Sequence, residues 1–298
     1  MNNVCEPKIK VIIMANSRCN AKCKHCYVSY DSERSPQNLL QTVISLQNQD
    51  YGVTIAGSEI LLEPNYLKAY KQAGQTRLLT NGLILKKKPE LYDILQNYGI
   101  KQFTFSLNFD VEQSLRSVPE SFIADRVRES KQRGFKVQVT TLVVPENVDS
   151  INRMCERAVR YGVNILQFNR FVKLGHDKRM NDYVLSDEQI LRFCDHINKM
   201  RQRFPEEQLV IKPHANFGPR PGSRGEKLAL ENLFCPAGIT VLALDADDNI
   251  YGCPFTMCKN AIVGRYDNNK IVINKVLLGD KRNTCIAHLL SDKKKVGK

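Results

Sequence analysis

The chain has 298 residues, of which 42% are hydrophobic and 25% are charged, a composition typical of ordinary globular proteins. This composition excludes collagen-like, coiled-coil and disordered proteins, and the length suffices for one large barrel or for two unequal domains. The 44 Lys and Arg residues outnumber the 31 Asp and Glu residues, so the net charge of +13 favours an anionic partner, with a solubilising surface as the alternative.

Up to about residue 170, short β-branched runs alternate with helical patterns, as in strand–helix units around a parallel sheet. Six strands are expected, at residues 10–14, 52–55, 76–80, 102–107, 136–143 and 164–168. Helices are expected between them, at residues 37–47, 64–72, 89–97, 121–132 and 150–161. Right-handed crossovers would curl these strands into an open barrel with ligands at the carboxyl ends. The sequence therefore predicts an α/β fold, a partial (β/α)6 TIM-like barrel, because six units fall short of a closed barrel's eight.

The rest of the chain predicts a smaller second domain. A helix is expected to begin at Ser186, which can form a capping box with Gln189, and to run to about residue 203. The Gly- and Pro-rich stretch 213–226 is an irregular connector, so we place the barrel at residues 1–212 and the second domain at residues 213–298. Residues 239–245 and 249–253 predict a β-hairpin, with another short strand near residues 261–266.

The chain has no apolar run of the roughly 20 residues that a membrane span needs, and no signal-peptide core. A cytoplasmic protein that does not bind membranes is therefore expected. Cytoplasmic thiols stay reduced, so the ten cysteines point to metal ligation or redox chemistry rather than to disulfides.

Three of these cysteines follow the first expected strand at spacings of four and three: Cys19, Cys23 and Cys26. A loop with this spacing can place thiolates at three corners of a cuboidal 4Fe-4S cluster and leave the fourth iron open to another ligand. A structural zinc site would instead need four closed ligands.

This loop resembles the hallmark of the radical S-adenosylmethionine (SAM) superfamily, whose C-x3-C-x2-C motif follows the first strand of a six-unit partial barrel. The resemblance implies that S-adenosylmethionine chelates the open iron and is cleaved by one electron to a deoxyadenosyl radical that abstracts a hydrogen atom. It also implies a one-electron reductant such as flavodoxin or ferredoxin.

Further residues match the superfamily's cofactor-binding positions. The loop Gly57-Ser58-Glu59 after the second strand looks like the family's Gly-Gly-Glu-Pro motif, although Ser58 and the following isoleucine depart from it. In that resemblance Gly57 allows close backbone approach and Glu59 complements the ammonium group of the cofactor. Tyr27, directly after the last cysteine of the loop, could meet the adenine. For the loop Gly57-Ser58-Glu59, the structural alternative is an ordinary strand-to-helix turn.

Polar residues at the ends of the later strands are candidates for cofactor or substrate contact. Ser106 and Asn108 share one face of the fourth strand because side chains alternate along a strand. Gln167 and Arg170 are the best candidates on the sixth strand. The sequence Thr80-Asn81-Gly82 after the third strand suits a turn with positive φ and a structural role.

A second cysteine set begins at Cys235 and Cys253, which resemble the C-x(9 to 15)-G-x4-C element of SPASM and twitch domains, with Asp248 in place of the glycine. The resemblance implies one auxiliary 4Fe-4S cluster held by Cys235, Cys253 and some combination of Cys258 and Cys285. Zinc bound by the same four thiolates is the alternative. Cys258 is also a candidate hydrogen-atom donor if Cys285 is a ligand.

The resemblance implies a peptide-modifying enzyme as the first functional hypothesis, forming a crosslink, a thioether or a D-residue in a ribosomally made peptide. The excess of basic over acidic residues suits an anionic peptide. Few residues, however, precede the first strand, where a leader-binding domain would be expected. The alternative enzyme is a small-molecule dehydrogenase or a cofactor-biosynthesis enzyme. The alternative of another class is a zinc-containing nucleic-acid-binding protein, which the absence of an RNA-binding signature disfavours.

Overall fold

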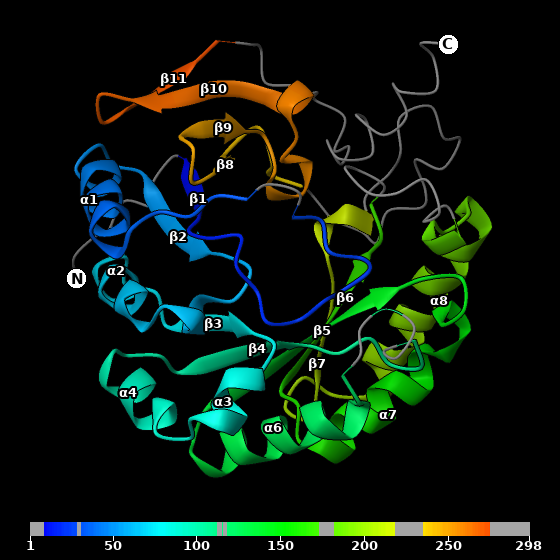
Figure 1. Ribbon diagram of the computed structural model, residues 1–298. Helices are drawn as coiled ribbons and strands as arrows, with labels where there is room; N and C mark the ends of the chain where they lie inside the picture. The colour runs from blue at the N-terminus through cyan, green and yellow to red at the C-terminus, as the bar shows by residue number, and fades with distance from the viewer. Residues whose placement is uncertain are drawn as a thin grey trace, which may run out of the picture.

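The computed structural model of the protein describes residues 9–28, 31–111, 115, 118–172, 182–217 and 235–274. Strands curve around the centre of the molecule and helices cover their outer side (Figure 1). The strands are β1 (Lys10–Met14), β2 (Gly52–Ala56), β3 (Arg77–Thr80), β4 (Gln102–Ser106), β5 (Lys136–Val143), β6 (Ile165–Arg170), β7 (Val210–Pro213), β8 (Val241–Leu244), β9 (Asn249–Tyr251), β10 (Ile262–Asp267) and β11 (Lys270–Ile273). The helices are α1 (Pro36–Gln47), α2 (Leu67–Gln72), α3 (Leu83–Lys87), α4 (Leu91–Asn97), α6 (Glu120–Gln132), α7 (Ile151–Tyr161) and α8 (Asp187–Arg203). In the described parts of the chain, no helix is long and apolar enough to cross a membrane.

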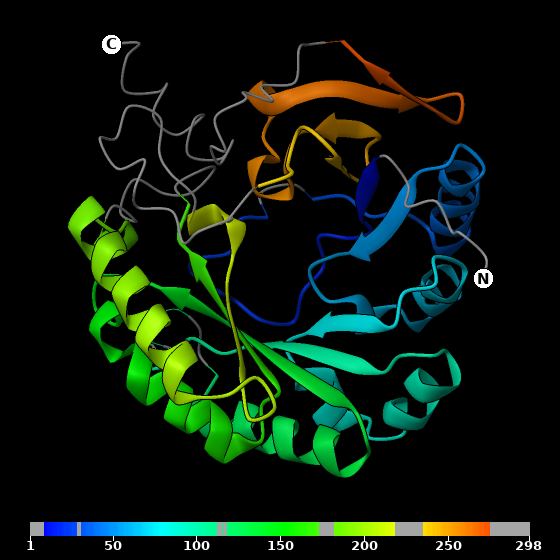
Figure 2. The ribbon, with the colours of Figure 1, turned by 180° about the vertical axis from the view of Figure 1, so that it is seen from behind.

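Strands β3 to β7 form a five-stranded sheet in which every neighbour is parallel, in the order β3-β4-β5-β6-β7. Helices α6, α7 and α8 cover its outer face, as Figure 2 shows from behind. Parallel strands need crossover connections, and the strand–helix alternation of the sequence supplies them. The expected partial barrel is therefore confirmed.

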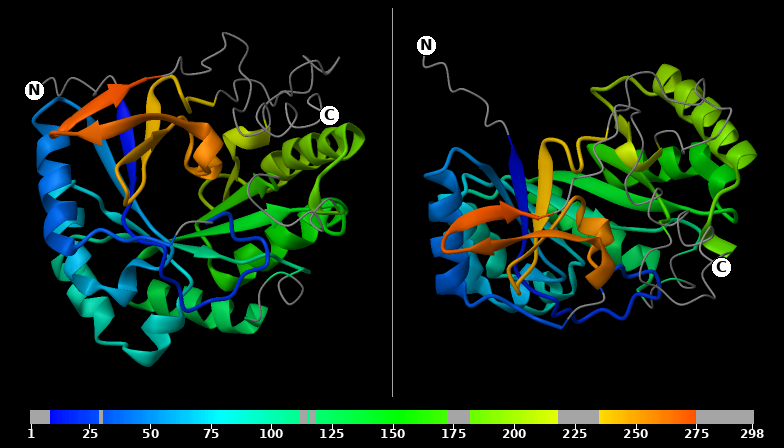
Figure 3. Two further views of the ribbon diagram at one scale, coloured as in Figure 1. Left: turned by 45° about the horizontal axis from the view of Figure 1, so that its top comes forward. Right: turned by 90° about the horizontal axis from the view of Figure 1, so that it is seen from above.

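The second sheet joins the two ends of the chain. Its order is β11-β10-β9-β8-β1-β2, and β1 pairs in parallel with both β2 and β8. Strands β8 to β11 are successive antiparallel neighbours, and β10 and β11 lie beyond β8 and β9 (Figure 3). The predicted hairpin is thus present as β8 and β9, and its first strand continues the parallel series of the barrel. The division at residue 213 remains a prediction, and the sheet shared by β1 and β8 crosses it.

The side chain of Gln75 connects the two sheets where β2 and β3 are not paired. The amide nitrogen of Ile55 donates to Gln75 Oε1 at 2.7 Å, and Gln75 Nε2 donates to the carbonyls of Ile55 and Arg77, both at 2.9 Å. Backbone groups inside a protein need such partners. One carboxamide therefore replaces the missing ladder bonds between these strands.

Alternation along the strands separates the hydrophobic core from the inner face. On β4, Phe103 and Phe105 are fully buried in the main core cluster, which also contains side chains of the surrounding helices. Their neighbours Gln102, Thr104 and Ser106 point to the opposite side because side chains alternate. The core therefore lies between sheet and helices, and the inner face is left for polar residues.

The six predicted strands and the helices match the observed elements closely, and α8 begins with the expected capping box at Ser186. Sequence patterns missed α3, β7 and β11, which have only four or five residues each. Short elements carry too little periodicity to be recognised. In the expected connector, Pro213 ends β7 and a short 3-10 turn covers Ala215–Phe217, while residues 218–226 lie outside the described residues.

Candidate functional site

The loop that carries Cys19, Cys23 and Cys26 follows β1 at the carboxyl end of the parallel strands. Cys19 and Cys26 are exposed, and Cys23 is half-buried. The Cys19 sulfur accepts hydrogen bonds from the amide of Ala21 at 3.4 Å and from Asn81 Nδ2 at 3.6 Å. Asn81 follows β3, so the end of the third strand supports the cysteine loop. The sequence predicts a structural role for this turn, and the particular contact of Asn81 with Cys19 is known only from the structure.

The surroundings of the loop disfavour a free thiolate at Cys26. Its pKa is raised, mainly because burial penalises the charged form, and negative charge at Cys19 adds to the effect. A hydrogen bond from the backbone of Val28 acts in the opposite direction. The thiol still reaches solvent, so its burial is partial. A positively charged metal centre would favour the thiolate again.

Across the described residues, no three His, Cys, Asp or Glu side chains are close enough together to hold a single metal ion. Around one zinc ion, with Zn–S bonds of about 2.3 Å, thiolates must lie in mutual contact. A cuboidal cluster has a separate iron at each corner, so its ligands stand farther apart. Cys19, Cys23 and Cys26 lie in one loop and offer three thiolate donors, which is the ligand type that such a cluster takes.

Asn16 joins the start of the cysteine loop to the loop after β2. The amide of Ser58 donates to both the backbone and side-chain oxygens of Asn16, at 3.1 Å each, and Asn16 Nδ2 donates to the carbonyl of Glu59 at 3.3 Å. A Cβ atom on Gly57 would lie 2.6 Å from Asn16 Oδ1. Close approach, rather than positive φ, therefore requires glycine here. The buried hydroxyl of Ser58 has no hydrogen-bond partner among the described residues and remains a candidate for cofactor contact.

Glu59 is completely buried, and its carboxylate is engaged within the protein. It accepts from the Thr80 hydroxyl at 3.0 Å and from the amides of Asn81 at 2.9 Å and Leu61 at 3.3 Å. Burial raises the pKa of Glu59 to about 6, against the opposing effect of these hydrogen bonds. Its expected contact with the cofactor's ammonium group remains a prediction, and its observed contacts connect β2 to β3.

Ser106 is the last residue of β4 and lies on the inner face, and Asn108 follows the strand. Ser106 pairs with Thr140 of β5 in the ladder. Asn108 is buried and its side-chain oxygen accepts from the amide of Leu142 at 2.9 Å. Part of the Asn108 side chain therefore fixes the end of β5. Their expected cofactor contacts remain predictions.

The two candidates of β6 lie on opposite faces of the sheet. Gln167 accepts from Gln138 at 3.1 Å on the inner face. Arg170 is three residues further, shares the outer face with Phe168, and has its guanidinium 5.9 Å from the ring centre of Phe217. An odd spacing in a strand reverses the side, so of these two candidates only Gln167 lies on the inner face. Whether either side chain contacts the cofactor remains a prediction.

Tyr27 lies between the first cysteine loop and the second cysteine set. Its ring contacts Phe255 edge to face with centroids 4.9 Å apart, and Phe255 contacts His214 at 5.7 Å. Burial raises the pKa of Tyr27, and negative charge at Cys26 and Cys253 raises it further. An adenine contact remains a prediction. The observed position places one aromatic ring beside both sets of thiols.

The second cysteine set is only partly assembled in the described residues. Cys235 and Cys253 are buried in one small cluster with Ala215, Ala237 and Phe255. Cys258 instead packs against a neighbouring cluster that contains Met14, Tyr251 and Met257. Cys285 lies outside the described residues. The structure thus brings two of the four expected ligands into one cluster and places a third against another cluster.

The turn between β8 and β9 has the conformation expected for the glycine position of the motif. Asp248 has φ of 66°, in the left-handed region that an aspartate tolerates better than most residues. The buried carboxylate of Asp245 accepts hydrogen bonds from the amides of Asp247 and Asn249, both at 2.9 Å, and from the Tyr251 hydroxyl at 2.8 Å. A dense carboxylate-centred turn therefore positions the strand that leads to Cys253.

Arg34, at the end of the first cysteine loop, contacts this turn directly. Its Nη2 donates to the carbonyl of Asp245 at 2.8 Å and to the carboxylate of Asp248 at 2.5 Å. The Arg34 backbone is held by the carbonyl of Ala15 and by the hydroxyl of Tyr66. The two cysteine-bearing regions are therefore connected through one buried guanidinium.

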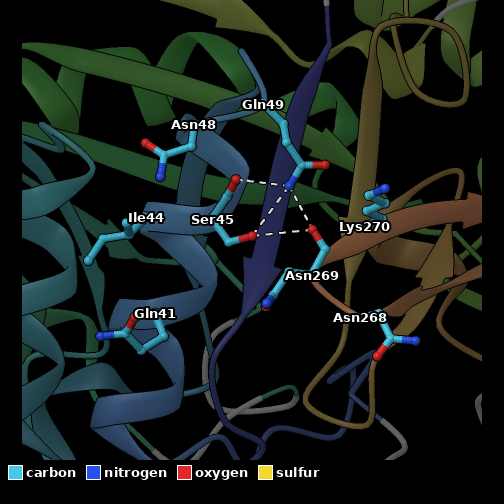
Figure 4. A pocket seen from close by; sticks show the side chains of 8 residues that line it. All are labelled: Gln41, Ile44, Ser45, Asn48, Gln49, Asn268, Asn269 and Lys270. Carbon is cyan, nitrogen blue, oxygen red and sulfur yellow. Dashed lines mark hydrogen bonds between the residues drawn. The ribbon is translucent and has the colours of Figure 1, made fainter.

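A surface pocket of about 660 Å³ lies apart from both cysteine regions, between α1 and the turn of the β10–β11 hairpin (Figure 4). Ser45 and Gln49 donate to the carbonyl of Asn269 at 3.2 and 2.6 Å, so the polar residues here hold the hairpin against α1. The other lining residues are Gln41, Ile44, Asn48, Asn268 and Lys270.

These observations define a partial-barrel protein whose cysteine loop adjoins a second strand loop suited to a cofactor. Comparison with known proteins places residues 14–158 in a known family, since they match the model "Radical SAM superfamily". The chain therefore contains a radical SAM domain, and such a domain implies a 4Fe-4S cluster and S-adenosylmethionine.

Two curated relatives are about one quarter identical to the chain over the residues that align. The chain is 26% identical over 224 residues to the antilisterial bacteriocin subtilosin biosynthesis protein AlbA of Bacillus subtilis. This match covers 67% of the chain and 49% of AlbA. It is 27% identical over 186 residues to the pre-heme d1 synthase of Dinoroseobacter shibae, and this match covers 58% of the chain and 46% of the synthase. The chain thus spans about half the length of these relatives.

Solved structures show the same fold at low sequence identity. SuiB of Streptococcus suis superposes with a TM-score of 0.63 at 13% identity, over 84% of the chain and 61% of SuiB. The protein anSMEcpe, solved with bound AdoMet and the Cp18Cys peptide, superposes with a TM-score of 0.66 at 14% identity, over 93% of the chain and 82% of anSMEcpe.

Proposed function

We propose that the protein is a radical SAM enzyme that modifies a ribosomally made peptide by crosslinking, thioether formation or epimerisation. The observation that carries this proposal is the joined pair of loops, in which Asn16 connects the cysteine loop to Gly57 and Ser58. The similarity to AlbA, a bacteriocin biosynthesis protein, supports a peptide as the substrate.

In this proposal the thiolates of Cys19, Cys23 and Cys26 hold the 4Fe-4S cluster and leave one iron without a protein ligand. The bound cofactor supplies a deoxyadenosyl radical after one-electron reduction by a flavodoxin or ferredoxin. Gly57 lets the backbone after β2 come close to the loop, and the free hydroxyl of Ser58 offers a hydrogen bond there. Asn81 holds the Cys19 sulfur in place by its hydrogen bond.

The auxiliary 4Fe-4S cluster is part of the same proposal. The burial of Cys235 and Cys253 in one small cluster, and the position of Cys258 five residues further, support three of its ligands. Cys285 remains the proposed fourth ligand. If Cys285 is a ligand and Cys258 is not, Cys258 can serve as the hydrogen-atom donor.

A small-molecule substrate is the second candidate, and one observation favours it. The similarity to a pre-heme d1 synthase matches the alternative of a cofactor-biosynthesis enzyme. Both candidates share the first cluster and the cofactor, so they differ only in what enters the barrel.

The first test concerns the cluster. After anaerobic reconstitution, we expect the protein to bind about eight iron atoms per chain for two 4Fe-4S clusters, and to release deoxyadenosine when reduced with S-adenosylmethionine. The Cys23→Ala variant should release none, whereas the control Cys194→Ala, which removes a buried thiol of α8, should retain this activity. Normal release from a variant lacking all three loop cysteines would contradict the assignment.

The second test concerns the substrate. The protein is co-expressed with a short peptide encoded beside its gene, in heavy water, and the peptide is analysed by mass spectrometry. A mass loss indicates a crosslink or thioether, and uptake of one deuterium indicates epimerisation. A peptide unchanged in both respects, beside a cluster-loaded protein that still cleaves S-adenosylmethionine, refutes the peptide assignment.

The third test separates an auxiliary cluster from zinc. Replacing Cys235 and Cys253 together by alanine should lower the iron content to about four atoms per chain, with deoxyadenosine still released. An unchanged iron content together with a loss of zinc would refute the auxiliary cluster.

A further inference from the structure

Lys212 occupies an inner-face position that no motif of the sequence points to. It pairs with Gln167 in the ladder between β6 and β7, and its neighbour Ile211 is buried on the helix side. Since side chains alternate, Lys212 lies on the same side as Gln167. Lys212 is exposed, so its ammonium group is available from the inner side of the sheet.

The ammonium of Lys212 has no counter-charge within the described parts of the chain. It makes no hydrogen bond or ion pair with another described residue. The same inner face of β3 to β7 carries two more cations, Arg77 and Lys136, and no Asp or Glu. An excess of one sign on a concave, low-dielectric face attracts a ligand of the opposite sign.

A row of carboxamides beside Lys212 gives this region its polarity. Gln102 donates to Gln138 at 3.3 Å, Gln138 to Gln167 at 3.1 Å, and Gln167 to Asn169 at 3.1 Å. The row crosses β4, β5 and β6 and runs toward the carboxyl ends of the strands. These neutral groups satisfy one another, so they supply no counter-charge to Lys212.

Lys212 is close in sequence to the contacts that reach the cysteine loop. Two residues further, His214 contacts Phe255, which contacts Tyr27 beside Cys26. The strand that carries Lys212 therefore ends against the region where the cluster and cofactor are proposed.

We propose that Lys212 is a specificity-determining residue whose ammonium binds a carboxylate on the inner face, beside Gln167. The ligand is an acidic side chain of the substrate or the carboxylate of S-adenosylmethionine, which share the same chemistry. If the carboxylate belongs to the substrate, this inference rests on the proposed function; if it belongs to S-adenosylmethionine, it does not.

Lys136 provides a matched control. It is an exposed cation on the same inner face, also without an ion pair among the described residues, but it lies at the start of β5. Thr140, four residues along the strand, is level with Gln167 and Lys212. Four residues of strand separate the two levels by about 13 Å. If the effect were one of general charge, replacing either lysine would change ligand binding. If the site binds a carboxylate, only the replacement of Lys212 should change it.

The experiment measures binding without turnover, by calorimetry and ligand-detected NMR on the full chain with reconstituted clusters. The substrate probes are N-acetyl-glutamate methylamide and the matching glutamine compound. The cofactor probes are S-adenosylhomocysteine and its decarboxylated analogue. Each pair differs by one carboxylate, so the affinity ratio within a pair reports the carboxylate contribution.

We expect the wild-type protein to prefer the carboxylate member of at least one pair by about tenfold, as a charge-assisted contact provides. Lys212→Met should abolish that preference, Lys212→Arg should retain most of it, and Lys136→Met should leave it unchanged. A change in the glutamate pair assigns the carboxylate to the substrate, and a change in the cofactor pair assigns it to S-adenosylmethionine.

Equal ratios in wild type and Lys212→Met for both pairs would overturn the inference, as would an equal loss in Lys136→Met. Unchanged unfolding curves for the variants show that the fold is intact. The co-expression test of the peptide is independent of these ratios. A failure there with a positive cofactor pair refutes the peptide function and leaves the Lys212 site standing.

Discussion

Removal of the Arg34 guanidinium tests how the cysteine loop and the β8–β9 turn are held together. Arg34 is 7% exposed and donates from Nη2 to the carbonyl of Asp245 and to the carboxylate of Asp248. Arg34→Met keeps a long unbranched side chain and removes the donors. The carbonyl of Asp245, whose residue is only 2% exposed, then loses a charged hydrogen-bond donor.

The two contacts differ in how much they contribute. A buried acceptor left without its charged donor costs about 1–3 kcal/mol. The side chain of Asp248 is 41% exposed, so its ion pair with Arg34 is screened by solvent and contributes less than about 1 kcal/mol. We therefore expect Arg34→Met to lower the free energy of unfolding by about 2–3 kcal/mol.

The matched control is Asp248→Asn, because asparagine keeps an acceptor and tolerates the positive φ of this position. It should cost less than about 1 kcal/mol. Both variants are measured by urea unfolding of the full chain under anaerobic conditions, together with the double variant. The coupling energy from this cycle should also stay below about 1 kcal/mol.

Two results would refute this reasoning. If Asp248→Asn costs as much as Arg34→Met, the exposed ion pair rather than the buried carbonyl carries the connection. If Arg34→Met costs less than about 0.5 kcal/mol, the typical range for a surface substitution, the guanidinium does not hold the β8–β9 turn to the cysteine loop.

Three further predictions concern the connections of β2. Gln75→Leu removes the carboxamide that serves the amide and carbonyl of Ile55, and should lower the free energy of unfolding by about 2–4 kcal/mol, measured by urea unfolding. Gly57→Ala places a Cβ 2.6 Å from Asn16 Oδ1, so it should cost about 1–3 kcal/mol and weaken the binding of S-adenosylhomocysteine in calorimetry; unchanged values for both would contradict the close approach. The pKa of Glu59 is raised from 4.5 to about 6. Its stabilising contribution is therefore complete below about pH 4.5 and is lost as pH rises through about 6. Over this range the free energy of unfolding should fall by about 2 kcal/mol. The free energy of unfolding of Glu59→Gln should lack this fall, and equal pH profiles for both proteins would show that Glu59 titrates normally.

Much of the architecture could be predicted from local patterns. The β-branched runs and helical periodicities located the main strands and helices, because alternation and the 3.6-residue period are local properties of the chain. The cysteine loop and the positive φ of Asp248 were also predictable, since spacing and backbone preference involve only neighbouring residues.

The positions of single side chains could not be predicted in the same way. Strand β6 extends through Arg170 and so places Arg170 and Gln167, both candidates from the sequence, on opposite faces. The hydrogen bonds of the Glu59 carboxylate to Thr80 and Asn81 were not predictable from the sequence either. Both outcomes depend on which strand ends meet, and this is a property of the folded sheet.

The sequence by itself determined the class of protein, because three thiols at fixed spacing after a strand have a defined chemistry. Only the tertiary structure decided that β8 pairs with β1, that Arg34 meets Asp245, and that Lys212 faces inward, where no described residue supplies a counter-charge. Such contacts join residues that are far apart in the chain. Their formation depends on the pairing of strands and on the exclusion of water between them, which no local pattern of residues encodes.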